Sequence, residues 1–152
     1  MKGEPMIKTI LVPTDGSMPA QKAARYAIDL AKQLRCSIII LSVIDNPTIL
    51  EQPVSDNVHH IIEPVEDYLR QAAEAYTREI KEICDENGVR SKILITSGYP
   101  AEEIIKEAES ANIDLIVIGS HGRSALAAAF LGSVTYSIIQ KETKIPVLIV
   151  RR

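Results

Sequence analysis

The sequence predicts an α/β domain built on a parallel sheet, and two observations support this fold class. Five short runs of apolar, β-branched residues recur along the 152-residue chain. Each run is apolar on both of its alternating faces, as in strands that helices cover on both sides of a sheet. The segments between the runs carry apolar residues at helical spacing. Such alternation of strands and helices is typical of a parallel sheet with right-handed crossovers.

The elements follow from these patterns in chain order. The predicted strands are Ile7–Pro13, Ser37–Ile44, Lys92–Thr96, Ile113–Ile118 and Pro146–Val150. Four amphipathic helices lie between them. Their apolar stripes are Ala20, Ala24, Ala27, Ala31 and Leu34; then Val65, Leu69, Ala72, Tyr76, Ile80 and Ile83; then Ile104, Ile105, Ala108 and Ala111; and finally Val134, Ile138 and Ile139.

Local signals mark some of the helix ends. Gly88 follows the second helix and is a candidate C-cap, and Pro100 opens the third helix, with two glutamates in its first turn. The connection Asp45–Glu63 is long, and the second helix is expected to begin around Ile61. Loops of more than about 12 residues in compact domains are usually functional or mobile. The adjacent pair His59–His60 is expected on this loop, where the two rings point apart and make a poor metal pair.

Composition excludes several classes of protein. With 46% hydrophobic residues the chain has enough apolar surface to fold, unlike a disordered segment. Seventeen basic against 20 acidic residues give a net charge of −3, without the basic excess expected of a nucleic-acid binder. Aromatic residues for base stacking are scarce, since there is no Trp and one Phe. Cys36 and Cys84 form neither a disulfide framework nor a zinc ligand set, and we expect both in the core.

The lengths of the apolar runs and of the chain also indicate where the protein is located and how many domains it has. No apolar run approaches the ~18 residues of a membrane helix, and no apolar signal region opens the chain. We therefore expect a cytoplasmic protein without a membrane partner. Residues 1–152 are expected to form one domain, with Met1–Pro5 as a flexible lead and Met6 as an alternative start.

Asp15 lies directly after the first predicted strand, within Val12–Ser17. In open α/β sheets ligands bind at the carboxyl ends of the strands, where the strand order switches. Two interpretations stay open: Asp15 is an N-cap or Asx-turn residue, or its carboxylate accepts hydrogen bonds from a ribose or a base edge. No GxGxxG pattern follows this strand, so the dinucleotide fingerprint is missing.

A glycine-rich pattern follows the fourth predicted strand. Gly119, Gly122 and Gly132 are spaced by two and nine residues, and Ser133 comes next at the start of the fourth helix. Glycines let backbone N–H groups approach a phosphate closely, and a helix N-terminus favours an anion. Ser133 either binds the same phosphate or caps the helix, and in the empty protein we expect it to cap the helix.

These residues resemble the universal stress protein family, specifically its ATP-binding branch. The resemblance rests on Gly119, Gly122, Gly132 and Ser133 at this spacing and on Asp15, and it spans Ile7 to Val150. It implies a single three-layer domain with strand order 3-2-1-4-5 and four helices, of the adenine nucleotide alpha hydrolase-like, Rossmann-like type. It also implies a homodimer through the last strand, Ile145–Val150, which that order leaves at an edge of the sheet.

The resemblance further implies a nucleotide site. Pro13, Thr14 and Asp15 would hold the adenosine end, and Val43 would contact adenine through its backbone. The ribose and phosphate side would be lined by Ile118, Gly119, Ser120, His121 and Gly122, and the phosphates would lie on Gly132, Ser133 and Val134, with Mg²⁺ or Mn²⁺ held by the phosphates. Arg123 either reaches a phosphate or lies exposed on the surface. His121 either touches phosphate or lies at the rim.

Three functional classes are compatible with this pattern to different degrees. A nucleotide-binding signalling module for the stress response, acting through an unknown protein partner, is favoured over an ATPase or phosphotransferase. No Walker lysine follows Gly132, so hydrolysis is expected to be slow or to need a partner. A phosphoacceptor receiver is excluded because Thr96–Gly98 contains no acid. A flavoprotein-like nucleotide binder shares the architecture and stays as the remaining alternative.

Overall fold

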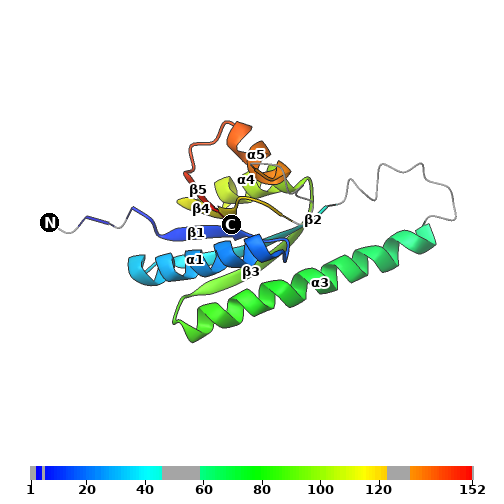
Figure 1. Ribbon diagram of the computed structural model, residues 1–152, viewed down its shortest axis with the longest axis horizontal. Coiled ribbons are helices and arrows are strands. Elements are labelled where there is room, and N and C mark those ends of the chain that lie inside the picture. Colours follow the sequence, from blue (N-terminus) through cyan, green and yellow to red (C-terminus); the bar gives the residue numbers. More distant parts are fainter. Residues whose placement is uncertain (1–2, 5, 46–58, 123–130, 152) are drawn as a thin grey trace.

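The computed structural model describes residues 3–4, 6–45, 59–122 and 131–151, and for residues 59–64 it describes the backbone alone. Its five parallel strands form one sheet in the order β3-β2-β1-β4-β5 (Figure 1). The strands are β1 (Thr9–Pro13), β2 (Ser37–Asp45), β3 (Ser91–Gly98), β4 (Leu115–Gly119) and β5 (Val147–Val150). The described helices are α1 (Met18–Leu34), α3 (His59–Glu86), α4 (Pro100–Ser110) and α5 (Ser133–Gln140). The predicted α/β class and strand order are thus confirmed.

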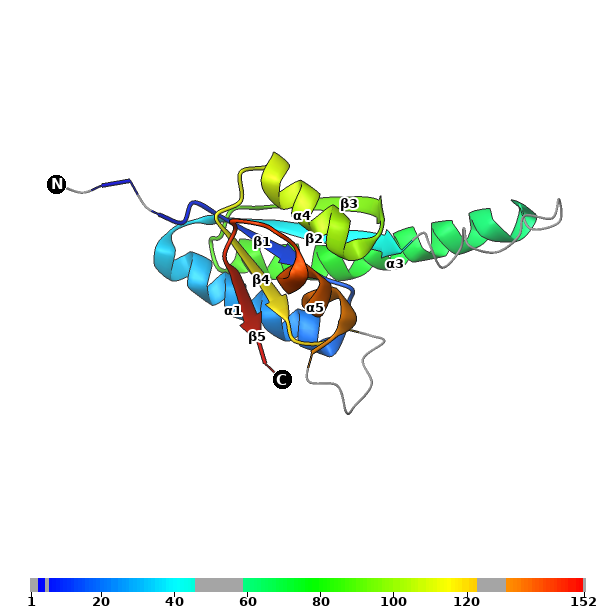
Figure 2. The ribbon, with the colours of Figure 1, turned by 90° about the horizontal axis from the view of Figure 1, so that it is seen from above.

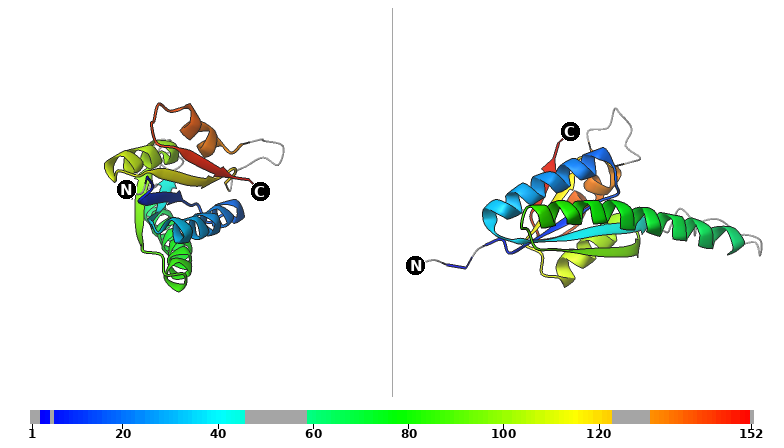
Figure 3. Two further views of the ribbon diagram at one scale, coloured as in Figure 1. Left: turned by 90° about the vertical axis from the view of Figure 1, so that its left-hand side faces the viewer. Right: turned by 90° about the horizontal axis from the view of Figure 1, so that it is seen from below.

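The helices form two layers around the sheet. Helices α1 and α3 cover one face, while α4 and α5 cover the other (Figure 3). The packing of strand β2 explains why its run Ile38–Leu41 is apolar at four successive positions. Ile38 and Ile40 pack toward α1 and α3, and the alternate residues Ile39 and Leu41 pack toward α4 and α5. Side chains that alternate between two buried faces favour apolar residues, and the buried polar residue Ser42 has its hydroxyl hydrogen-bonded to Tyr76.

The strand limits differ from the prediction by one to two residues. Strand β1 begins at Thr9 and not at Ile7, and β4 begins at Leu115 and not at Ile113. Strand β3 is longer than predicted, because it pairs with β2 from Ser91 to Gly98. Ladder hydrogen bonds to the neighbouring strand set these limits, and apolar runs report them only approximately.

The buried face of α3 is only partly as predicted. From the predicted stripe Ile80 is buried, and Leu69, Ala72, Tyr76 and Ile83 are half-buried. Ala73, Thr77, Ile80 and Cys84 are buried, whereas Val65 from the predicted stripe is 41% exposed. The helix also begins at His59, earlier than expected, so His59 and its neighbour open a helix and do not lie on a loop. Figure 1 shows the reason, since the first half of α3 extends beyond the sheet. No sheet surface is available there to bury an apolar stripe.

Three further stripe residues are exposed, namely Leu34, Ala111 and Ile139. Leu34 is the last residue of α1, and Ala111 follows the end of α4 as its C-cap. Ile139 lies in the last turn of α5, beside the buried Ile138. Helical spacing places these residues beside the buried stripe, but it does not fix the edges of the helix face that the fold buries.

Both predicted helix-end signals are confirmed. Gly88 has a φ of 68°, in the left-handed region that glycine adopts without strain. Its N–H donates to the Asp85 carbonyl, and the next N–H, of Val89, donates to the Cys84 carbonyl. This pair of bonds is the Schellman arrangement. At the start of α4, Pro100 is the first residue, and both first-turn acids, Glu102 and Glu103, are present.

None of the helices in the described part of the chain combines the length and the apolar character needed to cross a membrane.

Candidate functional site

A cavity of about 300 Å³ opens at the carboxyl ends of the central strands, on the α4 and α5 face of the sheet. Figure 2 looks onto this face, with α4 and α5 in front of the strands. Strand order reverses between β1 and β4, so the chain leaves these strands in opposite directions and opens a crevice. The cavity is lined by Pro13, Thr14, Asp15, Ala20, Leu41, Val43, Asp45, Pro100, Ile104, Ile118, Gly119, His121, Gly122, Gly132, Ser133, Val134 and Thr135.

Most of the predicted site residues meet at this cavity. The lining contains the predicted residues of β1, β2, β4 and α5 with two exceptions. Ser120 is buried behind the lining, and Arg123 lies outside the described residues. The structure therefore brings together segments that are more than 100 residues apart in the sequence. Whether they bind a nucleotide stays a prediction.

One oxygen of the Asp15 carboxylate stabilises the loop after β1, and the carboxylate also faces the cavity. Its Oδ1 accepts a hydrogen bond from the Ser17 N–H at 3.0 Å, which is an Asx-turn. Its Oδ2 lies against Gly122, where an added Cβ would come within 2.5 Å of it. The N-cap of α1 is Ser17, whose Oγ accepts from the Ala20 N–H at 3.3 Å. The Asx-turn interpretation is thus confirmed, and the N-cap interpretation is wrong.

The end of β4 and the start of α5 are packed backbone to backbone. The Gly132 N–H donates to the Ser120 carbonyl at 2.7 Å, and the Thr135 hydroxyl donates to the Gly119 carbonyl at 2.8 Å. A Cβ on Gly132 would lie 3.1 Å from His121 Cα. A Cβ on Gly119 would lie 2.9 Å from the Pro19 carbonyl oxygen, at the start of α1. Gly119 and Gly132 are therefore required for close backbone packing inside the protein, whether or not they also contact a ligand.

Ser133 does not cap α5. The N-cap residue is Gly132, with extended φ and ψ of −68° and 157°, and its carbonyl accepts from the Tyr136 N–H at 2.9 Å. Ser133 is the first helical residue and is exposed. A serine caps a helix only from the non-helical position before it, which glycine occupies here. The first N–H groups of an α-helix have no intrahelical acceptor, and Ser133, Val134 and Thr135 line the cavity.

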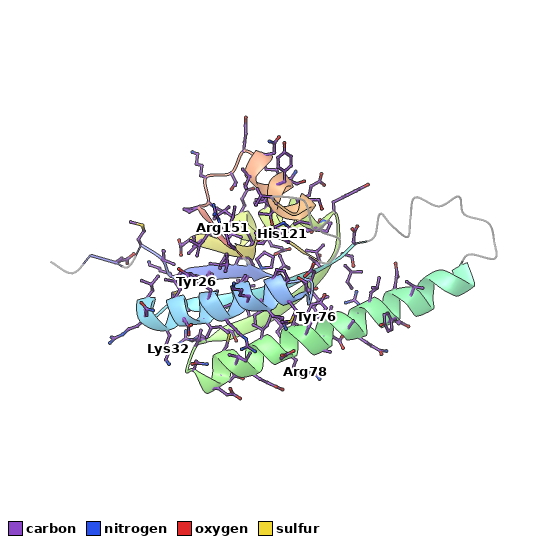
Figure 4. All side chains as sticks on the ribbon, viewed as in Figure 1. Tyr26, Lys32, Tyr76, Arg78, His121 and Arg151 are labelled. Atoms are coloured by element: carbon purple, nitrogen blue, oxygen red, sulfur yellow. The ribbon has the colours of Figure 1, made fainter. Side chains whose placement is uncertain are left out.

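His121 is buried at the cavity wall and does not lie at an exposed rim. It is 8% exposed, and its Nδ1 lies 2.9 Å from the Ser120 hydroxyl oxygen. Figure 4 marks the ring close to α5. Ser120 in turn donates its N–H to the Val150 carbonyl at 3.0 Å, on β5. The ring is thus fixed by a residue that is itself anchored to two neighbouring elements.

Sequence reasoning missed six lining residues: Ala20, Leu41, Asp45, Pro100, Ile104 and Thr135. Leu41 and Asp45 were accessible from the sequence, because they share with Val43 the face of β2 set by its two-residue period. Pro100 and Ile104 carry no such signal. They reach the cavity only because α4 packs over the ends of β2 and β3.

The charge of the cavity is unusual for an anion site. Its ionisable lining residues are Asp15, Asp45 and His121, and no lysine or arginine occurs in the lining that the structure describes. The described part of the chain also holds no group of three or more His, Cys, Asp or Glu side chains that would bind a metal ion. Among the described residues, an anionic ligand would therefore meet backbone N–H groups and no cationic side chain.

The fold and this crevice define a class, the single-domain α/β proteins with a ligand crevice at the strand switch point. The model of the universal stress protein family matches residues 6–151. The chain is 34% identical to universal stress protein MJ0577 of Methanocaldococcus jannaschii, over 97% of this chain and 96% of that protein. This chain therefore belongs to the universal stress protein family.

Solved structures agree with that assignment. The structure of MJ0577 superposes with a TM-score of 0.81 and covers 97% of each chain. A universal stress protein solved in complex with cAMP has 24% identity and a TM-score of 0.67, over 95% of this chain and 97% of that one. A family protein of Arabidopsis thaliana with AMP bound has 16% identity and a TM-score of 0.67, over 95% of this chain and 92% of that one. At these lower identities the likeness shows the shared fold.

Proposed function

We propose that this universal stress protein binds ATP in the cavity at the strand switch point and acts as a nucleotide-dependent module of the stress response. The observation that carries the proposal is the convergence of Asp15, the end of β4 and the start of α5 on one cavity. Solved family members with cAMP or AMP bound support an adenine nucleotide as the ligand to test.

The proposed pose follows from the chemistry of the two ends of the cavity. Asp15 at the β1 end accepts hydrogen bonds and suits ribose hydroxyls. Val43 and Ile104 offer an aliphatic wall for adenine. The first turn of α5, which follows the N-cap Gly132, offers the N–H groups of Ser133 and Val134 and a positive dipole end to phosphates.

A divalent cation, Mg²⁺ or Mn²⁺, fits this arrangement. The described lining contains two carboxylates and no cationic side chain, so the charge of a triphosphate would be balanced largely by a metal ion that the phosphates hold. The Ser133 hydroxyl, exposed at the start of α5, is the side chain placed to contact the ion or a phosphate.

We propose binding without efficient hydrolysis. Phosphoryl transfer needs a charge clamp on the transferred group and a positioned nucleophile. The described lining offers no cationic side chain, and Arg123 is the single cation of the segment 123–131 that could act as the clamp. In this proposal ATP is a signal that a protein partner reads, in the cytoplasm. The partner surface includes a homodimer contact along the edge strand β5.

Two measurements test the binding proposal. Mass spectrometry of small molecules released from the purified protein should detect ATP, whereas released FAD would favour a flavoprotein-like binder. Calorimetry with added MgCl₂ should then give tighter binding for ATP than for AMP, because only ATP reaches the first turn of α5 with its terminal phosphates. Equal affinities for ATP and AMP would contradict the phosphate role of Gly132 and Ser133.

A further inference from the structure

Two hydrogen bonds join residues 119–122, at and after the end of β4, to residues 132–135 at the start of α5, where we propose that the phosphates bind. One runs from the Gly132 N–H to the Ser120 carbonyl, at 2.7 Å. The other runs from the Thr135 hydroxyl to the Gly119 carbonyl, at 2.8 Å. The first is backbone to backbone and depends on no side chain. The second depends on a single hydroxyl group.

Thr135 is placed to act on the position of α5. It is 3% exposed and lies in the first turn of the helix, one residue after Val134. Because the bond ties that turn to the last residue of β4, it limits rotation of the helix start about the Gly132 contact. The direction of the first N–H groups of α5 depends on that rotation.

The acceptor of this bond is itself held in place. Gly119 ends β4, in register with Val150 of β5. The start of α1 packs directly against its Cα, since an added Cβ would lie 2.9 Å from the Pro19 carbonyl oxygen. Thr135 therefore links α5 to a point that three other elements fix.

We infer that Thr135 is a positioning residue for phosphate recognition: its hydroxyl bond to Gly119 fixes the first turn of α5 so that its N–H groups point at the phosphates of the bound nucleotide. This inference rests on the proposed function. It assigns Thr135 to the phosphate part of the ligand and not to the nucleoside, which meets β1 and β2 at the other end of the cavity.

Calorimetry with ATP and MgCl₂, and separately with adenosine, tests the inference on Thr135→Val and Thr135→Ser. Valine keeps the shape of threonine and removes the hydroxyl, and we expect about a tenfold or greater loss of ATP affinity with an adenosine affinity within about twofold of the wild type. Serine restores the hydroxyl and should restore ATP affinity. A purely structural defect would weaken both ligands together and would not be specific to phosphate.

Thr77→Val is the matched control. Thr77 is also buried and its hydroxyl also donates to a backbone carbonyl, that of Ala73 at 2.6 Å, but it lies on α3 and not at the cavity. The ATP affinity of Thr77→Val should equal that of the wild type. If wild-type protein binds ATP and Thr135→Val binds it equally tightly, or loses ATP and adenosine alike, the inference on Thr135 is wrong. If wild-type protein binds no ATP, the proposed function itself fails.

Discussion

Asp15 shows how one side chain combines a structural and a proposed binding role. One carboxylate oxygen accepts from the Ser17 N–H and shapes the turn between β1 and α1. The other oxygen lies against Gly122, at the cavity. The two interpretations of this residue therefore do not compete, because they use different oxygens. Substitutions that keep one oxygen acceptor and remove the charge separate the two roles.

Asp15→Ala and Asp15→Asn form the first test. Alanine removes both roles, and we expect ATP binding to weaken by about 1–3 kcal/mol, the cost typical of deleting one partner of a buried polar contact. Asparagine still accepts from the Ser17 N–H, so its unfolding midpoint in urea should match that of the wild type. If both variants bind ATP with unchanged affinity in calorimetry, Asp15 has no role in binding.

Gly122→Val tests the contact between Asp15 and Gly122 by changing the glycine. The new Cβ would lie 2.5 Å from Asp15 Oδ2, so the carboxylate has to move away and the added side chain enters the cavity. We expect no measurable ATP binding and a native circular dichroism spectrum. Gly3→Ala, where a Cβ would meet no atom within 4 Å, is the control and should bind normally. Normal binding by Gly122→Val would remove this glycine from the proposed site.

At the scale of elements, β5 shows how a position in the sheet creates a surface. It pairs with β4 on one side and is last in the strand order. The Pro146 carbonyl accepts from the Ile116 N–H of β4, and the Val150 carbonyl accepts from the Ser120 N–H, directly after β4. Because successive residues of a strand direct their backbone groups to opposite sides, those of Val147 and Ile149 point to the outer edge. Such an edge, whose four side chains are all half-buried, is suited to pairing with a second chain.

Ile149→Pro tests the proposed homodimer. Proline removes one outward N–H while the bonds from β5 to β4 remain, and an edge strand tolerates this change. In sedimentation the wild type should have twice the 16.7 kDa monomer mass, and the variant should sediment as a monomer. Ile149→Val keeps the N–H and should stay dimeric. A wild type that is monomeric at micromolar concentration rules the dimer out.

At the scale of the whole molecule, the sheet divides the core into two parts with different roles. The core between the sheet and α4 and α5 borders the cavity. The core on the other side, under α1 and α3, contains both cysteines, Cys36 and Cys84. Burial raises the pKa of each thiol. Thiols of this kind are poor nucleophiles, so the prediction that the cysteines are core residues is confirmed.

The cysteines give a prediction for the pH dependence of stability. In the folded protein both thiol pKa values lie above the ordinary value of about 8.5, so unfolding releases protons at higher pH. The free energy of unfolding should therefore be unaffected by these groups below about pH 8 and should fall as the pH rises through the raised pKa values. Urea titrations of the wild type and of Cys84→Ala should differ in this slope above pH 9, and equal slopes would contradict the burial argument.

Labelling with iodoacetamide gives an independent check that both thiols are buried in the native protein. At pH 8 the native protein should react slowly at both thiols, whereas protein unfolded in urea should react at the rate of a free cysteine. Rapid labelling of Cys84 in the native protein would show that α3 opens locally from the sheet.

The sequence by itself determined the α/β class, the nature of every described strand and helix, and most of the cavity lining. The fold class and the elements depend on local signals, namely apolar periodicity and the residues that follow each strand. Glycine spacing and Asp15 pointed to the family, and most of the lining was predicted from that resemblance. The tertiary structure decided which face of α3 is buried, that Gly132 and not Ser133 caps α5, and that α4 closes the cavity with Pro100 and Ile104. Each of these depends on where the sheet ends or on which backbone groups meet across the fold. Spacing along the chain does not contain that information, because it arises from contacts between residues far apart in the sequence.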